Sequence, residues 1–370
     1  MKNKLTIIEA IAVIAVITIS QIILDFPKYL IQITGTGTIM NLVFLGIFVI
    51  IFCLFLTKIL QPFTNQDILD ISELVGGKKL KNLISCSFLL LFFLSAASAT
   101  SNFIYLLKNI YFKNANLLFV LSIFLVSIFV ACRQGFHTIK KVSTFFFGML
   151  VISILCLPLG DNGNFNTNNL IPVFGYNYQT TFQTGIMNLF IFNFVLIYFF
   201  LMPLLSQKKD FSKIVFLSFF VNFTLIIIAV IAILQYYPTS ITEGLTSITS
   251  SSMILAVIRR IQINSFLSQT DSIFILVWGY AILSYVSLLI NGMIHILDKN
   301  FHYQCKEELS LSLIPLLLGS ILCINNQTKL YYLENAFLKN YSIVFAFGIC
   351  FLVSTVGYFK IKKGSHHAQK

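Results

Sequence analysis

Charged residues are scarce in this chain: Asp, Glu, Lys and Arg make up only 10% of its 370 residues, whereas a soluble globular protein carries about 25%. Hydrophobic residues account for 57%, including 39 Phe but a single Trp. No soluble core could bury so much apolar surface, so lipid must cover it. The composition therefore predicts an integral membrane protein.

Sequence motifs for catalysis, nucleotide binding and metal binding are also missing. The chain has no P-loop, no GxSxG, no HExxH and no CxxC, and its seven cysteines are scattered. None of its five histidines stands at metal-ligand spacing from another ligand. These absences argue against an enzyme, an ATP-driven pump, a disulfide framework, a metal site and a bound cofactor.

The net charge of +12 could suggest nucleic acid as a partner. However, the basic residues stand in short segments between apolar stretches, where they orient membrane helices. No basic helix or aromatic-basic motif accompanies them. The charge therefore favours a lipid bilayer, and not nucleic acid, as the surroundings of this chain.

Ten apolar stretches are each long enough to cross a bilayer, which takes about 20 residues in a helix. Only a helix satisfies the backbone polar groups of such a segment inside hydrocarbon. The predicted fold class is thus an all-α integral membrane protein with ten transmembrane helices. Their expected ranges are 6–26, 38–58, 83–107, 116–133, 140–159, 183–205, 213–236, 270–294, 309–325 and 341–360.

An even number of spans puts both termini on one side of the membrane. With the termini in the cytoplasm, the inner loops hold 18 of the 25 Lys and Arg residues, and the outer loops hold the remaining 7. The positive-inside rule therefore predicts cytoplasmic termini. The expected inner loop 59–82 is long enough for a short helix, and residues 253–263 predict an outer interfacial helix with Arg259 and Arg260 at headgroup level.

The spans divide into two sets of five around a long outer loop at 160–182. An odd number of spans per half gives the halves opposite orientations, which predicts a 5+5 inverted repeat within one permease domain, 1–370. The halves would cover about 6–159 and 183–360. In transporters of this design, spans 1 and 6 are discontinuous and hold the substrate near the midplane.

Span 1 carries Thr18, Ser20 and Gln21 in its apolar run, followed by Pro27. Proline cannot donate to the helix ladder, so a break here would free backbone groups for a ligand. The alternative is a continuous helix with a polar packing face and Pro27 beyond its end. Asp25 is either an intramembrane functional acid or a residue at the outer headgroup boundary.

Spans 3, 6 and 8 supply the other candidate ligand-binding residues. Ser98 belongs to a stripe of small polar residues that could instead serve close helix packing. Asn188 and Asn193 in span 6 could bind a ligand or a neighbouring helix. Tyr280 and Ser284 lie in span 8, where a serine hydroxyl could also bond its own helix.

The chain resembles the B-subunit permeases of bacterial endospore germination receptors, in the amino acid–polyamine–organocation superfamily. The resemblance covers nearly the whole length and rests on an ordered set of features, none of them specific alone. They are residues 5–10 (LTIIEA) with Pro27, Gly135 followed by Lys141, residues 185–203, and residues 258–266 leading to Asp271 and Trp278.

That resemblance implies an inverted-repeat permease fold, a nutrient site at spans 1 and 6, and a complex with A-type and C-type receptor subunits in the spore inner membrane. The sequence departs from the family pattern at several places. Lys141 replaces the usual Arg, His137 replaces an acid, and span 1 lacks the usual Gly-rich break. These departures leave the identity of the nutrient open.

Three functions fit these features. The first is a germinant receptor subunit that binds an amino acid or similar nutrient and signals through its partners. The second is a secondary amino acid transporter coupled to H⁺ or Na⁺, and the third is a structural membrane protein without a cavity. A proton-coupled carrier needs a titratable group in its midplane, and no acid or His beyond Asp25 lies deep in an expected span. This favours a receptor or a passive path.

Overall fold

The computed structural model describes residues 4–24, 26–159, 167–175, 177–236, 254, 257–258, 270–301, 306–324 and 333–368. Within these ranges the regular structure is helical, with one isolated bridge between Leu5 and Leu205. The expectation of an all-α protein is thus confirmed. Asp25, Arg259, Arg260 and most of the expected outer interfacial helix lie outside the described residues.

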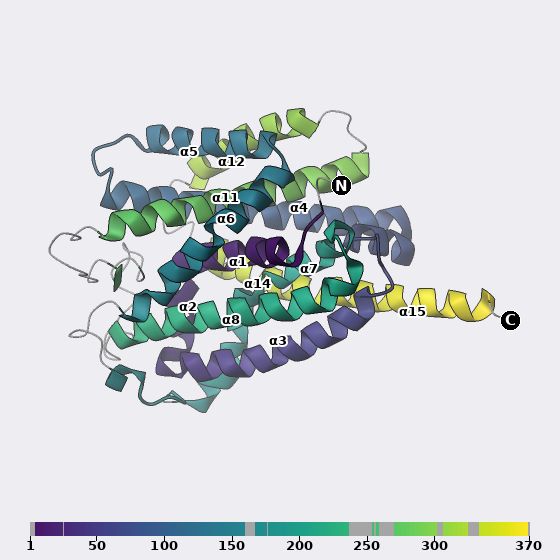
Figure 1. Ribbon diagram of the computed structural model, residues 1–370, viewed down its shortest axis with the longest axis horizontal. Helices are drawn as coiled ribbons and strands as arrows, with labels where there is room; N and C mark the ends of the chain where they lie inside the picture. The colour runs from purple at the N-terminus through teal and green to yellow at the C-terminus, as the bar shows by residue number, and fades with distance from the viewer. Residues whose placement is uncertain are drawn as a thin grey trace.

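The longer helices run roughly along one direction, and the N-terminal helix lies among them (Figure 1). The described α-helices are α1 (Ile7–Ile23), α2 (Phe26–Thr34), α3 (Thr38–Leu60), α4 (Ile68–Ile110), α5 (Leu117–Arg133), α6 (Phe136–Leu155), α7 (Val195–Leu201), α8 (Phe211–Tyr236), α11 (Thr270–Phe301), α12 (Lys306–Ile324), α14 (Lys339–Ile343) and α15 (Phe351–Ala368).

Seven helical stretches in the described ranges are long and apolar enough to cross a membrane. The helices Ile7–Ile23, Leu117–Arg133 and Glu308–Cys323 are apolar but shorter. Each of the ten ranges expected from the sequence falls on one of these ten stretches. The positions of the apolar helices were therefore readable from hydropathy.

Helix α1 forms the centre of the bundle and packs against α6, α8 and α11. Its start is set by a capping box, in which the Glu9 backbone N–H donates to the Thr6 hydroxyl and the Thr6 backbone N–H donates to the Glu9 carboxylate. From Val13 to Ile23 every side chain is buried. A predominantly apolar helix fits such a position, surrounded by protein on all sides.

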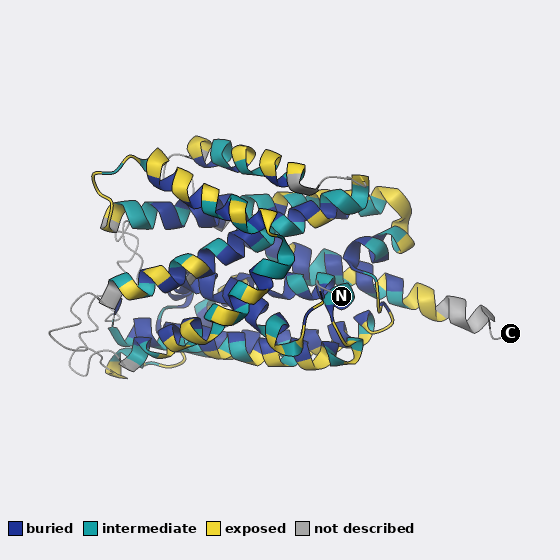
Figure 2. Cartoon of the chain, turned by 45° about the horizontal axis from the view of Figure 1, so that its top comes forward, coloured by how far each residue is buried: buried dark blue, intermediate teal, exposed yellow. Residues whose placement is uncertain are grey.

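The outer helices turn apolar side chains outward, so exposed and buried residues alternate around them (Figure 2). On α3, Phe44, Ile47, Phe48 and Ile51 are exposed at helical spacing, whereas Asn41 is fully buried. This inverts the pattern of a soluble protein and matches a bundle whose outer face meets lipid.

The short helix expected in the loop 59–82 is present as the first part of α4. Asp67 caps its first turn by accepting from the backbone N–H groups of Leu69 and Asp70. This part ends at Gly77, whose φ of 67° and ψ of −166° are not helical, and a second helical part continues to Ile110. Because glycine tolerates this conformation, the short helix and span 3 follow each other directly across a kink.

Candidate functional site

The helix that begins with α1 is interrupted after Ile23. Leu24 leaves the helical conformation with φ −85° and ψ 37°, and α2 begins at Phe26 and turns away from the axis of α1 (Figure 1). Pro27 stands in the first turn of α2, where its missing N–H costs no helical hydrogen bond. Pro27 therefore starts a second helix and does not simply follow the end of the first.

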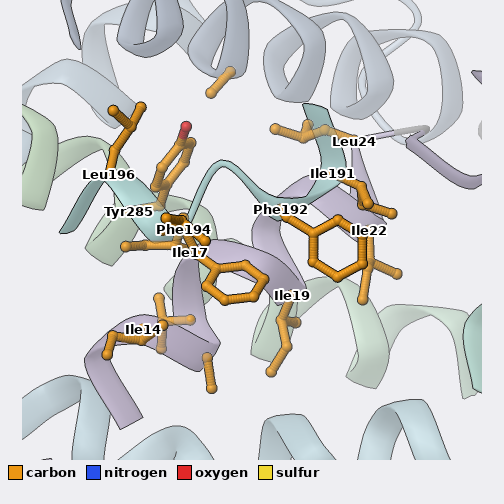
Figure 3. Close-up of a cluster of buried hydrophobic side chains, with 14 of the residues drawn as sticks. Ile14, Ile17, Ile19, Ile22, Leu24, Ile191, Phe192, Phe194, Leu196 and Tyr285 are labelled. Carbon is orange, nitrogen blue, oxygen red and sulfur yellow. The ribbon is translucent and has the colours of Figure 1, made fainter. Parts of the chain in front are cut away.

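A second interruption lies at residues 193–194. The chain forms a 3₁₀-helix, η5 (Thr184–Phe192), turns at Asn193 and Phe194, and continues as α7. Figure 3 shows Phe192 and Phe194 around this turn, beside Ile17, Ile19 and Ile22 of α1. The two helix breaks are thus neighbours in the core, although about 170 residues separate them along the chain.

The N-terminus fixes α1 next to the segment after α7. The Leu5 backbone N–H donates to the Leu204 carbonyl at 2.7 Å, and the Ser206 N–H donates to the Leu5 carbonyl at 2.9 Å. Lys140 of α6 adds hydrogen bonds to the Lys4 carbonyl and the Glu9 carboxylate, at 2.6 and 3.2 Å. These contacts hold the two interrupted helices side by side at the N-terminal end of α1.

A small cavity of about 60 Å³ lies at the two breaks. A cavity needs at least about 10–15 Å³ to hold a single water, so this one fits only a small molecule. The cavity is bounded by α1, α4, the turn at Asn193, α11 and the start of the last helical stretch. Its lining residues are Gln21, Leu24, Ser95, Ser98, Ala99, Asn193, Tyr285, Glu334, Leu338, Lys339 and Ser342.

Glu334 provides a buried carboxylate on the cavity wall, with its residue only 8% exposed. Its Oε2 accepts a hydrogen bond from the Tyr29 hydroxyl at 2.9 Å. Its Oε1 accepts from the Ser98 hydroxyl and from Asn102 Nδ2, the latter at 2.6 Å. A charge taken out of water needs such partners, so these three donors define where the carboxylate sits.

Lys339 brings an opposite charge to the same wall. Its Nζ lies 3.3 Å from the centroid of the Tyr29 ring and 4.5 Å from that of Phe190. Both distances are within the range of cation–π attraction. Lys339 is also attracted by the Glu334 charge. The cavity therefore presents one carboxylate and one ammonium group, both largely withdrawn from solvent.

Two amide oxygens in the cavity lack a protein partner among the described residues. They are Oε1 of Gln21 and Oδ1 of Asn193, and both are buried. Gln21 faces Tyr285, which also lies beside Ser95. A buried acceptor without a donor costs free energy, so a bound molecule with N–H groups would satisfy both oxygens.

Among the residues proposed from the sequence, the structure brings Gln21, Ser98 and Asn193 together around this cavity. Thr18 and Ser284 are buried but do not line it. The Ser20 hydroxyl donates to the Val16 carbonyl of its own helix at 2.7 Å.

The remaining two candidates lie elsewhere. Asn188 Nδ2 donates to Asn41 Oδ1 at 2.8 Å, so the asparagine joins two helices. Tyr280 is 43% exposed and stacks on Phe146 with ring centroids 4.3 Å apart. Their polar groups were visible in the sequence, but the direction in which a helix turns each side chain was not.

Sequence analysis missed Glu334, Lys339, Ser342 and Tyr29 as site residues, and it named Asn102 only as part of the small polar stripe of span 3. It placed Glu334 and Lys339 in an outer loop, because the last span was expected to begin at 341. Among the described residues, helical structure already covers Leu333, with a π-helical segment Leu333–Leu338 leading into α14. The last apolar stretch begins at Lys339, so the buried Glu334 lies just before it. The expectation that Asp25 is the only acid well inside a span stays a prediction. The absence of Gly and Pro between 330 and 347 was the available signal of a longer helix.

Comparison with known proteins identifies the family. The model of the family described as "Spore germination protein" matches residues 4–329. The chain belongs to this spore germination protein family. Glu334 and Lys339 lie beyond the matched range, so the family assignment and the charged pair are independent observations.

A curated relative is spore germination protein B2 of Bacillus subtilis (strain 168), which is 26% identical over 235 residues. That alignment covers 61% of this chain and 63% of the relative's length. Among solved structures, the fold is similar to a Na⁺-coupled sialic acid symporter in a substrate-bound outward-open state. The TM-score is 0.64 at 12% identity, over 96% of this chain and 79% of the symporter. This likeness shows a transporter-like fold.

Proposed function

We propose that this chain is the nutrient-binding subunit of a spore germinant receptor, and that its ligand is a small amino acid held at the two helix breaks. The observation that carries the proposal is the pairing of Glu334 and Lys339 on the wall of one small cavity. A zwitterion carries the complementary pair of charges. Its ammonium group would bind Glu334 and the oxygens of Gln21 and Asn193, and its carboxylate would bind Lys339.

Cavity size narrows the class of ligand. A volume of about 60 Å³ suits a molecule with very few heavy atoms, and alanine has six. Larger amino acids would require the lining helices to move apart. We therefore place glycine, alanine and serine ahead of aromatic or long-chain nutrients.

The membrane arrangement belongs to the same proposal. The seven long helices and the three shorter apolar ones together would form ten spans, as a 5+5 inverted repeat in one permease domain, with both termini in the cytoplasm. Family membership supports a location in the spore inner membrane and signalling through A-type and C-type receptor subunits. The similarity to a transporter supports the position of the ligand at the interrupted helices.

Binding to the purified full-length chain in lipid nanodiscs tests the ligand assignment. Alanine would be compared with ethylamine and propionate, which each lack one of its two charged groups. We expect alanine to bind and both analogues to bind at least about tenfold more weakly, since each forfeits a charge-assisted contact of roughly 1.5–3 kcal/mol. Equal binding of alanine and propionate would overturn the zwitterion assignment.

Receptor function is tested separately in spores. We expect spores without this gene to lose germination in response to one nutrient and to keep their response to a non-nutrient trigger. A normal response to every amino acid tested, in spores that carry no related receptor gene, would refute the receptor function without affecting the binding result.

A secondary amino acid transporter is the second candidate, and Glu334 favours it. The buried Glu334 carboxylate, just before the apolar stretch Lys339–Lys362, would supply the titratable group that H⁺ coupling requires. The sequence alone had offered only Asp25 for this role. Uptake of labelled alanine into liposomes containing the chain distinguishes the two functions. Accumulation driven by an imposed pH or Na⁺ gradient would establish transport, whereas binding without uptake supports a receptor.

A further inference from the structure

Four exposed lysines lie at one end of the helix bundle, where three neighbouring apolar stretches begin or end. Two of them follow the kink of α4, one lies in the last turn of α3, and one lies in α15, close to the end of the last apolar stretch. They are Lys78, Lys79, Lys58 and Lys360. We call this group the lysine surface.

Close packing of α15 brings the lysines of different helices together. A Cβ atom on Gly357 would lie 2.8 Å from Ile71 Cγ2, so a larger side chain there would push α15 away from the first part of α4. One turn later, Lys360 Nζ donates to the Val75 carbonyl at 2.8 Å. This bond holds the Lys360 charge beside the kink, next to the two lysines of α4. Helix α3 also packs against α15.

The acidic residues of the first part of α4 are already paired with other cations. Lys299 Nζ lies 2.7 Å from the Asp67 carboxylate and 2.5 Å from that of Asp70. The Glu73 carboxylate accepts from Lys81 Nζ at 2.8 Å. Within the part of the chain that the structure describes, none of the four lysines of the lysine surface forms an ion pair. The surface therefore has a positive charge that these carboxylates do not neutralise.

Large apolar side chains stand beside these lysines and also point outward. Leu74 and Leu83 of α4 and Phe359 of α15 are each at least half exposed. A lysine has an apolar stem and a charged end, so together these side chains suit the boundary between hydrocarbon and head groups. An acidic protein in water would match the charge of the surface but not its apolar part. A bilayer that contains anionic lipid matches both.

We propose that the lysine surface binds the phosphate groups of anionic phospholipids at this end of the bundle. A phosphate lies between the α4 kink and Lys360, and the acyl chains of the same lipid lie along the exposed face of α4 at Leu83. Each lysine near an anionic membrane surface strengthens binding by about fivefold. A lipid held in this way contacts α4 and α15 together, and it lies outside the helices that form the nutrient cavity.

Cys86 provides a native reporter, because it is exposed on α4 two turns after Lys79 and on the same side of the helix. Cys323, exposed near the end of α12, is the comparison. The full-length chain, with a fluorophore on one of these two cysteines, would be placed in phosphatidylcholine liposomes. Brominated lipid added in increasing amounts quenches a fluorophore that it contacts. We expect brominated phosphatidylglycerol to quench at Cys86 at a several-fold lower mole fraction than brominated phosphatidylcholine, with no such difference at Cys323.

Two double variants decide whether the lysine surface causes this preference. Lys78→Gln with Lys79→Gln should raise the required fraction of phosphatidylglycerol about tenfold, since two charges are lost. Lys108→Gln with Lys113→Gln, at the other end of α4, should leave it unchanged.

Salt gives a further test, because added ions screen exposed charges and should weaken the preference for phosphatidylglycerol. Equal quenching of Cys86 by the two lipids would overturn the proposal and leave an acidic protein as the partner of the surface. An equal effect of the two double variants would also overturn it. Because no nutrient is present, these results are independent of alanine binding.

Discussion

Asn102 on α4 donates a hydrogen bond of 2.6 Å to the carboxylate of Glu334, 232 residues further along the chain. The Ser98 hydroxyl, one turn earlier on α4, bonds the same carboxylate oxygen. The small polar stripe of span 3 thus faces an acid from the last helical stretch. Close helix packing, the other interpretation of that stripe, does not require this acid. Ser95 and Ser98 of the stripe line the small cavity beside Glu334.

Replacing Glu334 by Gln should weaken alanine binding by about 10- to 100-fold, since it removes a charged acceptor worth roughly 1.5–3 kcal/mol to an ammonium group. The amide keeps the shape of the side chain, so membrane insertion should be unchanged. Equilibrium binding in nanodiscs measures the effect. Tyr280→Phe on the outer face of α11 is the control, and an equal loss in both variants would refute the role of Glu334.

The double-mutant cycle of Glu334→Gln and Lys339→Met tests whether the two charges act as one unit. Each single change leaves the other charge buried without its opposite, so the double variant should be more stable than the sum of the single losses implies. Thermal unfolding in detergent gives the coupling, which we expect at about 0.5–3 kcal/mol. Strict additivity would show that the pair is not energetically coupled.

Gln21→Leu and Asn193→Leu should each reduce nutrient sensitivity without preventing membrane insertion. Both changes remove a buried oxygen that lacks a protein donor and lines the cavity. The loss in affinity should be about tenfold, which is what the loss of one hydrogen bond to a charged group would cause. Germination dose–response curves for spores carrying each variant provide the measurement.

Asn188→Leu is the matched comparison for those variants. Asn188 bonds Asn41 and does not line the cavity, so its replacement should lower thermal stability and leave the half-maximal nutrient concentration nearly unchanged. A shift in nutrient sensitivity as large as that of Asn193→Leu would mean that the ligand reaches further along η5 than the cavity does.

Asp67, just before the first residue of α4, predicts a pH dependence of stability. Burial would raise the pKa of Asp67, but the hydrogen bond with His295 and the charge of Lys299 outweigh it and lower the pKa to about 2. A carboxyl with a lowered pKa stabilises the folded state above its unfolded pKa, near 3.8. That contribution is lost as pH falls from about 4 through about 2.

Thermal unfolding between pH 2 and 6 checks this dependence. The wild-type chain should lose more stability on acidification than Asp67→Asn does, because the variant has no carboxyl to protonate at this position. At pH 6 the variant should be the less stable of the two. Parallel pH profiles for both proteins would contradict the assignment of the effect to Asp67.

Hydropathy alone determined the class of protein, since a chain with 57% hydrophobic and 10% charged residues can only be covered by lipid. Each of the ten apolar stretches was also readable, because a membrane helix must satisfy its backbone internally and so needs a continuous apolar run. Pro27 left two interpretations of span 1 open, a helix break or a continuous helix that ends before the proline. The structure shows α1 continuous through Thr18, Ser20 and Gln21, with an interruption between Ile23 and Phe26.

Tertiary structure decided which polar residues meet. Gln21, Ser98 and Asn193 face one cavity, whereas Ser20, Asn188 and Tyr280 have equally polar side chains that turn to their own helix, a neighbouring helix or the outer face. Glu334 and Lys339 complete the site from the last helical stretch, where a π-helical segment alters the usual period of 3.6 residues. A linear pattern does not specify the rotation of one helix against another, and only packing fixes it.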